Sequence, residues 1–270
     1  LKELIDKYGP ETLVSSEGTY RSDHLWARSR FTNLLGNPGN VIDPGTICWC
    51  WNYTLNMAMV GWPVESMMPA SPAQSKTIVN WGKRTQESYA PESPLWRVIN
   101  GKTSVGQDEP AQLIVIDPVC ITECGRADHW LQPYPNTDAI ICYAWINYII
   151  ENELWDHDFC REWTNLPFLV HEDTRLTYRA SELGLGTEDE YVVWDKKTNS
   201  AVAMPYPFPA DGSIDPEMFG SYELPNGETA RTAFQIMKEH VSEWTLEKAA
   251  EVCWLEADKI EEAIKIYVEG

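Results

Sequence analysis

One apolar run near the middle of the chain, Leu113–Ile116 (LIVI), constrains the fold more than any other segment. Four consecutive apolar residues leave no polar face, which is typical of a strand buried on both sides in a parallel sheet. Asp117 and Pro118 end the run, and therefore predict a carboxylate at the carboxyl edge of that sheet, where α/β domains bind ligands. Thr137 and Asp138 stand at the start of the apolar segment 139–150, a predicted helix. A strand-end carboxylate and a helix-start hydroxyl and carboxylate are groups that can bind the ribose and base of a nucleotide.

A second predicted strand, Thr77–Trp81, leads directly into a turn rich in cations and hydroxyls. The turn holds Gly82, Lys83, Arg84, Thr85 and Ser88. Glycine lets a ligand approach the backbone closely, and the other side chains can donate hydrogen bonds to phosphate. A solvated basic turn would have the same composition, so the turn alone does not distinguish the two. It matches neither a Walker loop nor the G-x-G-x-x-G fingerprint, which argues against ATP or NAD.

The alternation of strands and helices predicts the fold class. Segments 77–81, 94–100 and 113–116 follow one another as strand, helix and strand, an order that favours a parallel sheet. Further helices are predicted at 139–150, 156–163, 231–240, 245–253 and 258–267. The sequence therefore predicts an α/β fold with Rossmann-like parallel sheets and flanking helices.

Two stretches divide this pattern. The Pro- and Ser-rich segment 63–75 predicts a linker between a first domain, 1–75, and a second domain, 76–270. Residues 168–227 lack the strand–helix alternation and are predicted to form a surface insertion, with a small hairpin between 191 and 203.

Charge and hydropathy exclude two classes of partner. The formal net charge is −20, whereas nucleic acids and anionic membranes require a basic face. A phosphate-bearing ligand must therefore be held locally by a few cations and helix N-termini. The apolar segment 139–150 is too short to cross a bilayer and contains Asn147, so direct membrane insertion is not expected.

Cysteines and a histidine are the other candidates for chemistry. Cys48 follows the turn Gly45-Thr46 and precedes a predicted helix, a position that lowers a thiol's pKa and suits a thiolate metal ligand. Cys50 is the alternative, and both could equally be small buried hydrophobic residues. His24 lies near a polar loop, where it would shuttle protons or simply face solvent. Cys120 and Cys124 are interpreted as packed thiols rather than a metal pair, because no zinc-type ligand set lies near them.

The ordered set IVIDP…ADHWLQPYPNTD resembles the molybdopterin-guanine-dinucleotide enzymes of the dimethyl sulfoxide reductase family. Their usual pattern is a strand, Asp-Pro-Arg, then Ala-Asp, an apolar stretch and Pro-Gly-Thr-Asp. Segments Lys2–Gly36 and Gly45–Gly61 are also similar to the family's large catalytic subunit, the second to its metal-ligand loop. Val119 replaces the usual arginine and removes a cation. Asn136 replaces the usual glycine, and asparagine tolerates the left-handed backbone that such a turn demands.

The resemblance implies a molybdenum or tungsten bis-molybdopterin guanine dinucleotide cofactor lying across the carboxyl ends of the strands. Counting back from Gly61 makes Cys48 the metal ligand, and His24 would move protons on the substrate side. Domain 1–75 would carry the metal-ligand loop, and domain 76–270 would bind the guanine dinucleotide. The implied cofactor-binding residues are Gly82, Lys83, Arg84, Thr85, Ser88, Asp117, Thr137 and Asp138.

The implied reaction is oxygen-atom or hydroxyl transfer, or hydration, on a small substrate in anaerobic metabolism. The aromatic-rich Cys48 loop is most similar to the acetylene hydratase and phenolic transhydroxylase or dehydroxylase branch, which suggests an aromatic substrate. The expected partner is an iron–sulfur electron-transfer subunit. The chain is interpreted as an internal fragment, so a 4Fe–4S cluster and any export signal would lie before Leu1.

Cellular location and two alternative functions stay open at this point. The protein would be cytoplasmic, exported, or membrane-associated through a partner. A nicotinamide-dependent dehydrogenase would share the α/β alternation but would show a glycine-rich first turn. A non-catalytic structural subunit of the same fold would keep the strands and lose the Cys48 loop and the cations of the 82–88 turn.

Overall fold

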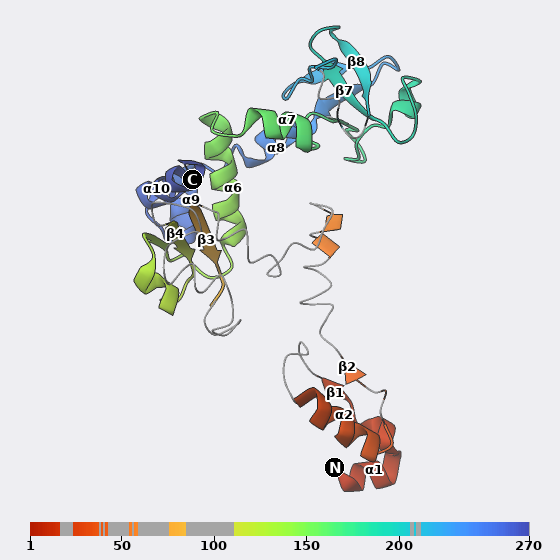
Figure 1. Cartoon of the computed structure of the whole chain (residues 1–270), viewed down its shortest axis with the longest axis vertical. Helices are drawn as coiled ribbons and strands as arrows, with labels where there is room; N and C mark the ends of the chain where they lie inside the picture. Colours follow the sequence, from red (N-terminus) through yellow and green to blue (C-terminus); the bar gives the residue numbers. More distant parts are fainter. Residues whose placement is uncertain are drawn as a thin grey trace. The chain divides into compact units, whose positions relative to one another are not determined.

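The computed structural model describes residues 1–16, 24–37, 39, 41–42, 54–55, 57–58, 76–84, 111–205, 208 and 212–269 (Figure 1). It divides into two compact units, Leu1–Ser71 and Pro72–Gly270. The assignment of 1–75 and 76–270 to separate domains of a longer enzyme stays a prediction.

In the residues that the structure describes, the first unit has the helices α1 (Lys2–Tyr8) and α2 (His24–Leu34), and residues 54–55 and 57–58 are also helical. The strand β1 (Ser15–Ser16) pairs in parallel with β2 (Val41–Ile42). Asn37 fastens the end of the α2 segment by donating from Nδ2 to the carbonyls of Pro10 and Leu13, each at 2.9 Å. The sequence pattern at 12–14 favours a strand, but residues 10–12 form a 3-10 turn and the strand begins at Ser15.

A parallel three-stranded sheet forms the centre of the second unit. Its order is β3 (Thr77–Trp81), β4 (Gln112–Ile116) and β5 (His129–Leu131), and both pairings are parallel. The predicted buried strand is confirmed, because β4 is central and each residue from 113 to 116 is at most 1% exposed. The predicted α/β class with a parallel sheet is therefore correct.

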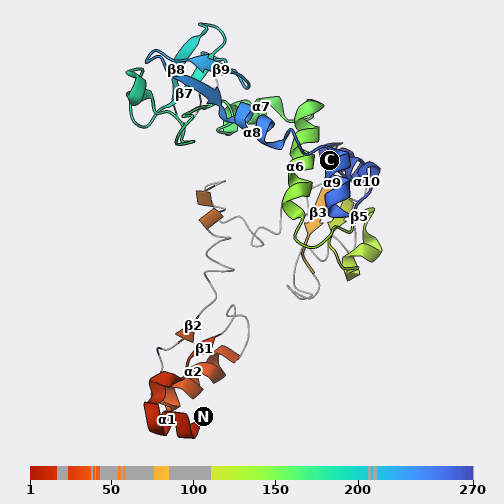
Figure 2. The ribbon, with the colours of Figure 1, turned by 180° about the vertical axis from the view of Figure 1, so that it is seen from behind.

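Each face of this sheet is covered by different residues. Ile114 and Ile116 of β4 point to a core that includes α6 (Asp138–Glu151), α9 (Leu246–Cys253) and α10 (Ala257–Glu269). Leu113 and Val115 point to the opposite side, where Ile78, Ile121 and Trp130 are among the residues that pack against them. The three helices lie together beside the strands in both views (Figures 1 and 2). Burial on both faces explains why the β4 sequence is continuously apolar.

The last helix is tied directly to the first strand of the sheet. Thr77 at the start of β3 donates its hydroxyl to the Ile266 carbonyl of α10 at 3.1 Å, across 189 residues of sequence. Among the described residues, three other helices have side-chain caps at their N-termini. Asp156 accepts from the Phe159 amide to begin α7 (His157–Trp163), and Thr232 accepts from the Gln235 amide to begin α8 (Ala233–Val241). Thr245 accepts from the Lys248 amide to begin α9.

Among the described residues, the predicted insertion 168–227, extended by the strand at 229–232 that follows it, holds two antiparallel sheets. The predicted hairpin is confirmed as β7 (Tyr191–Asp195) paired with β8 (Ser200–Met204). The other sheet has the order β6 (Leu169–Val170), β10 (Thr229–Thr232), β9 (Ser221–Glu223). Leu169, Tyr178, Val192 and Ala230 lie in a core of the insertion's own. Residues 231–232 are thus strand rather than helix, and α8 begins after them.

Candidate functional site

The residues that follow the parallel strands lie side by side at the carboxyl edge of the sheet. The Gly82 amide donates to the Ile116 carbonyl at 2.8 Å, and the Asp117 amide donates to the Leu131 carbonyl at 3.1 Å. Gly82 has a φ of +57°, and a Cβ at this position would meet no atom of the described residues within 4 Å. As far as these residues go, the backbone here is open to close approach by a ligand, as a phosphate-binding turn requires.

Asp117 is buried at the end of β4 and is held in place by local hydrogen bonds. Its side chain, 7% exposed, accepts from the Val119 amide through Oδ1 at 2.8 Å. Its carbonyl accepts from Trp130 Nε1 at 3.0 Å. These contacts fix the Asp117 backbone at the sheet edge. Val119 is 50% exposed, so an apolar side chain stands where the family pattern has a cation.

Asp138 reaches the same edge from the first turn of α6. Its Oδ1 accepts from Trp81 Nε1 at 2.6 Å, which joins α6 to the last residue of β3. Trp81 immediately precedes Gly82. The contact with Trp81 therefore brings Asp138 to the sheet edge at which Gly82 and Asp117 also lie. A carboxylate that accepts from one donor retains capacity for others, including ribose hydroxyls and the ring N–H groups of guanine.

The turn that leads into α6 has the backbone that its sequence predicts. Asn136 adopts a φ of +70°, which confirms the expectation of a left-handed residue at the usual glycine position. Thr137 is 9% exposed, and its hydroxyl donates to the Tyr134 carbonyl at 2.7 Å. The hydrogen of the Thr137 hydroxyl is therefore already used in a hydrogen bond within the turn. The hydroxyl oxygen can act towards a ligand only as an acceptor.

The remaining predicted residues divide into three groups. Lys83 and Arg84 lie at the sheet edge, and the Lys83 carbonyl accepts from Asn80 Nδ2 at 2.8 Å, which holds the turn. Thr85, Ser88 and Cys48 lie outside the described residues. His24 is the first residue of α2 in the first unit, whose position relative to the sheet edge is not defined. Among the described residues, no group of three or more His, Cys, Asp and Glu side chains is placed to hold a metal.

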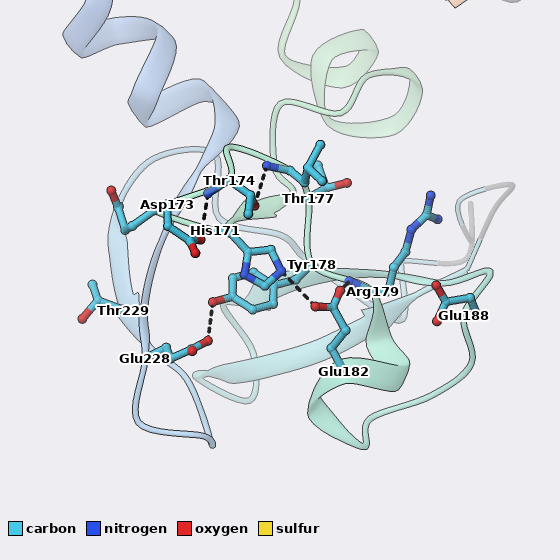
Figure 3. Close-up of a pocket in the computed structure, with 12 residues that line it drawn as sticks. His171, Asp173, Thr174, Thr177, Tyr178, Arg179, Glu182, Glu188, Glu228 and Thr229 are labelled. Atoms are coloured by element: carbon cyan, nitrogen blue, oxygen red, sulfur yellow. Dashed lines mark hydrogen bonds and ion pairs between the residues drawn. The ribbon is translucent and has the colours of Figure 1, made fainter.

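A hollow of about 900 Å³ lies on the insertion (Figure 3). His171 stacks on Tyr178 with ring centroids 3.5 Å apart, and its Nε2 lies 2.9 Å from Glu182 Oε2. The Tyr178 hydroxyl donates to Glu228 Oε2 at 2.7 Å. Burial is the main cause that raises the pKa of Tyr178 far above its ordinary value, and the hydrogen bond to the Glu228 carboxylate is the next. The phenol therefore stays protonated. These polar groups satisfy one another, and no residue of the sequence prediction lies here.

Glu172, at the rim of this hollow, should contribute a pH-dependent part of the stability. Arg231 donates to both of its carboxylate oxygens, from Nε at 2.6 Å and from Nη2 at 2.7 Å. This hydrogen bonding by Arg231 lowers the pKa of Glu172 below its ordinary 4.5, although burial opposes the shift. A carboxylate with a lowered folded-state pKa stabilises the protein above the unfolded-state value and loses that effect as the pH falls through the folded-state value.

We therefore expect Glu172→Gln to be less stable than the parent at neutral pH and equally stable in sufficiently strong acid. Urea unfolding at a series of pH values below neutrality would measure the difference. Glu223→Gln is the control, because the described contacts of Glu223 include no ion pair. A difference between Glu172→Gln and the parent that stays constant with pH would contradict the linkage.

Comparisons with known proteins agree on one group of enzymes. No family model matches the chain. A Halobacterium salinarum protein, provisionally named as the catalytic subunit of a dimethyl sulfoxide reductase, is 30% identical over 190 residues, which cover 70% of this chain and 21% of that protein. Dopamine dehydroxylase from Eggerthella lenta is 28% identical over 197 residues, which cover 73% of this chain and 18% of that protein.

A solved structure supports the fold. Acetylene hydratase from Pelobacter acetylenicus matches with a TM-score of 0.50 and 23% identity, covering 97% of this chain and 26% of that chain. At this identity the likeness shows the fold alone. The chain spans about a fifth of the length of the curated relatives it matches.

Proposed function

We propose that this chain, whose homologues are catalytic subunits of the dimethyl sulfoxide reductase family of molybdopterin enzymes, is the part of such a protein that binds a guanine dinucleotide. The convergence of Gly82, Asp117 and Asp138 at the carboxyl edge of one parallel sheet carries the proposal. Open α/β sheets bind their ligands in this place. The complete protein would transfer an oxygen atom or a hydroxyl group, or hydrate a small substrate.

The residues at the edge fit the chemistry of this dinucleotide. Guanine presents ring N–H and amino donors and ribose presents hydroxyls, and the carboxylates of Asp117 and Asp138 can accept from both. The open backbone at Gly82 and the cations Lys83 and Arg84 supply what a diphosphate requires locally, in a chain with a net charge of −20. When bound, the cofactor would supply the redox-active or Lewis-acidic molybdenum or tungsten centre. The protein's part at this edge is to bind and orient the nucleotide.

The residues proposed to bind the metal and to move protons are assigned from their positions in the sequence. Cys48 would be the protein's ligand to the metal, because a soft thiolate suits a centre already coordinated by dithiolene sulfurs. His24 would carry protons on the substrate side. Thr85 and Ser88 would extend the phosphate-binding turn, and Thr137 would accept from the nucleotide.

The substrate and the partners are proposed from the relatives. The similarity to dopamine dehydroxylase supports a small aromatic substrate for this chain's complete protein. Relatives whose names mark them as one subunit of a sulfite or dimethylsulfide dehydrogenase support an iron–sulfur electron-transfer partner, and a 4Fe–4S cluster would lie in the part of the enzyme before this segment. Because the homologues are molybdopterin enzymes, the nicotinamide alternative is set aside.

Asp138→Ala in the complete enzyme tests this proposal. Removing a partner of buried donors costs about 1–3 kcal/mol, a weakening of retention by roughly 5- to 150-fold. The amount of guanine nucleotide released on denaturation after dialysis would measure it, with metal content measured in parallel. Trp81→Phe is the matched control, because it removes the indole donor to Asp138 and keeps the carboxylate. Equal retention in Asp138→Ala and the parent would refute the nucleotide assignment.

A further inference from the structure

Helix α9 ends in a backbone conformation that disfavours the residue found there. Trp254, directly after α9, has a φ of +58° and a ψ of +37°, and the Leu255 amide donates to the Ala250 carbonyl at 2.9 Å. This is the left-handed helix end at which glycine is usual, because a side chain is strained there. A bulky residue in this place costs stability, and residues held in such conformations gather at functional sites.

The Trp254 side chain does not offset this cost by packing into a core. It is 75% exposed, and it belongs to none of the apolar cores formed by the described residues. The centroid of its ring lies 4.4 Å from that of Tyr134, and the two ring planes are inclined by 45°. Tyr134 is itself 46% exposed. The two rings therefore form a pair that presents aromatic surface outward.

Hydrogen bonds join this pair to the turn that leads into α6. The Tyr134 amide donates to the Cys253 carbonyl at 2.8 Å, and the Thr137 hydroxyl donates to the Tyr134 carbonyl at 2.7 Å. The Cys253 thiol also donates to the Thr137 carbonyl, with 3.7 Å between sulfur and oxygen. Asp138 follows Thr137 directly. The backbone that carries the two rings is therefore fixed to the turn that presents the Asp138 carboxylate.

We propose that Tyr134 and Trp254 form a stacking surface for the base of the nucleotide that Asp138 binds. This inference rests on the proposed function and extends it from the edge of the base to its face. A carboxylate accepts from the N–H groups at the edge of guanine and leaves both faces of the ring free. Aromatic side chains bind those faces, and they do so whatever the base is. Asp138 would thus select guanine, and the ring pair would hold the base against the turn.

Trp254→Gly in the complete enzyme tests the stacking surface. Loss of the indole should weaken retention of the guanine nucleotide by roughly 5- to 150-fold. The nucleotide still bound after a series of dialysis times would be released by denaturation and measured. Trp254→Phe keeps an aromatic ring and should retain most of the nucleotide. Thermal unfolding of protein prepared without the cofactor gives a second measurement. There Trp254→Gly should be at least as stable as the parent, because glycine suits the left-handed conformation.

Two further variants separate the possible outcomes. Trp163→Ala is the control, because Trp163 is also exposed, at 69%, but lies in α7, and it should leave retention unchanged. Asp138→Ala, measured in the same assay, distinguishes this inference from the proposed function. Weakened retention in Trp254→Gly with full retention in Asp138→Ala would overturn the assignment of Asp138 and support the stacking surface.

Two results would overturn the stacking surface. The first is retention in Trp254→Gly equal to that of the parent, whatever Asp138→Ala shows. The second is a Trp254→Gly protein that unfolds at a lower temperature than the parent when both lack the cofactor. That result would mean that the Trp254 ring packs against another part of the complete protein rather than against a base.

Discussion

Replacing Cys48 with alanine should abolish turnover of the complete enzyme while its fold persists. Under the proposed function this thiolate would bind the metal directly and would tune its electronics. Loss of a residue that hydrogen-bonds a metal ligand already lowers metal affinity or activity by about 10- to 100-fold, so the loss of a direct ligand should lower turnover by more than about a hundredfold. Turnover, metal content and thermal unfolding of the same preparation would measure the effect.

Cys50→Ala is the matched control, since Cys50 lies two positions further along the same loop. We expect it to retain most of the activity and to change only packing. If Cys50→Ala lost turnover and Cys48→Ala kept it, the ligand role would pass to Cys50. If both variants kept full activity, the thiolate-ligand mechanism would be wrong.

Leu131→Ala should destabilise the second unit more than a substitution elsewhere on the sheet edge. Leu131 is 0% exposed, and it belongs to the core that β4 shares with α6, α9 and α10. Truncating a buried leucine removes its transfer free energy and leaves a cavity, at a cost of about 2–5 kcal/mol. Urea unfolding monitored by circular dichroism would give the change in the free energy of unfolding.

Val119→Ala provides the comparison for Leu131→Ala, because Val119 is 50% exposed and lies in the same neighbourhood. A surface substitution of this kind should change stability by less than about 0.5 kcal/mol. Equal effects of the two substitutions would mean that β5 is not packed into the core as described.

Several elements could be predicted because their sequences have one dominant pattern. The continuous apolar run gives β4, the apolar segment from 139 gives α6, and the alternating stretch around 191–203 gives the hairpin of β7 and β8. The positive φ of Asn136 also follows from its sequence position, since few residues tolerate that conformation. In each case the local physical constraint is strong enough to decide the structure by itself.

Other elements depend on tertiary pairing that the local sequence does not encode. The strands β5 and β9 are three residues long and β6 is two residues long. Strands this short show no recognisable alternation of apolar and polar residues. Arg231 and Thr232 continue a helix-like pattern, but they pair with β6 in the sheet and the Thr232 side chain caps the helix that follows. Short strands are defined by their neighbours more than by their own residues.

The candidate site shows the same division. That Asp117 and Gly82 share an edge follows from the rule that parallel strands end together. The bond between Trp81 and Asp138 joins residues 57 positions apart and has no signal in the sequence. The hydrogen bond from the Thr137 hydroxyl to the Tyr134 carbonyl likewise could not be predicted, because it depends on the conformation of the turn.

The contact between Thr77 and Ile266 has a consequence for biosynthesis. β3 is translated 189 residues before its helical partner, so one apolar face of the sheet lacks its final cover until α10 has been made. The insertion is translated in between and has a core of its own, drawn from residues 169–230. The order of synthesis therefore determines which part completes its core first. The insertion can fold on the ribosome while the earlier sheet still exposes strands that a chaperone would recognise.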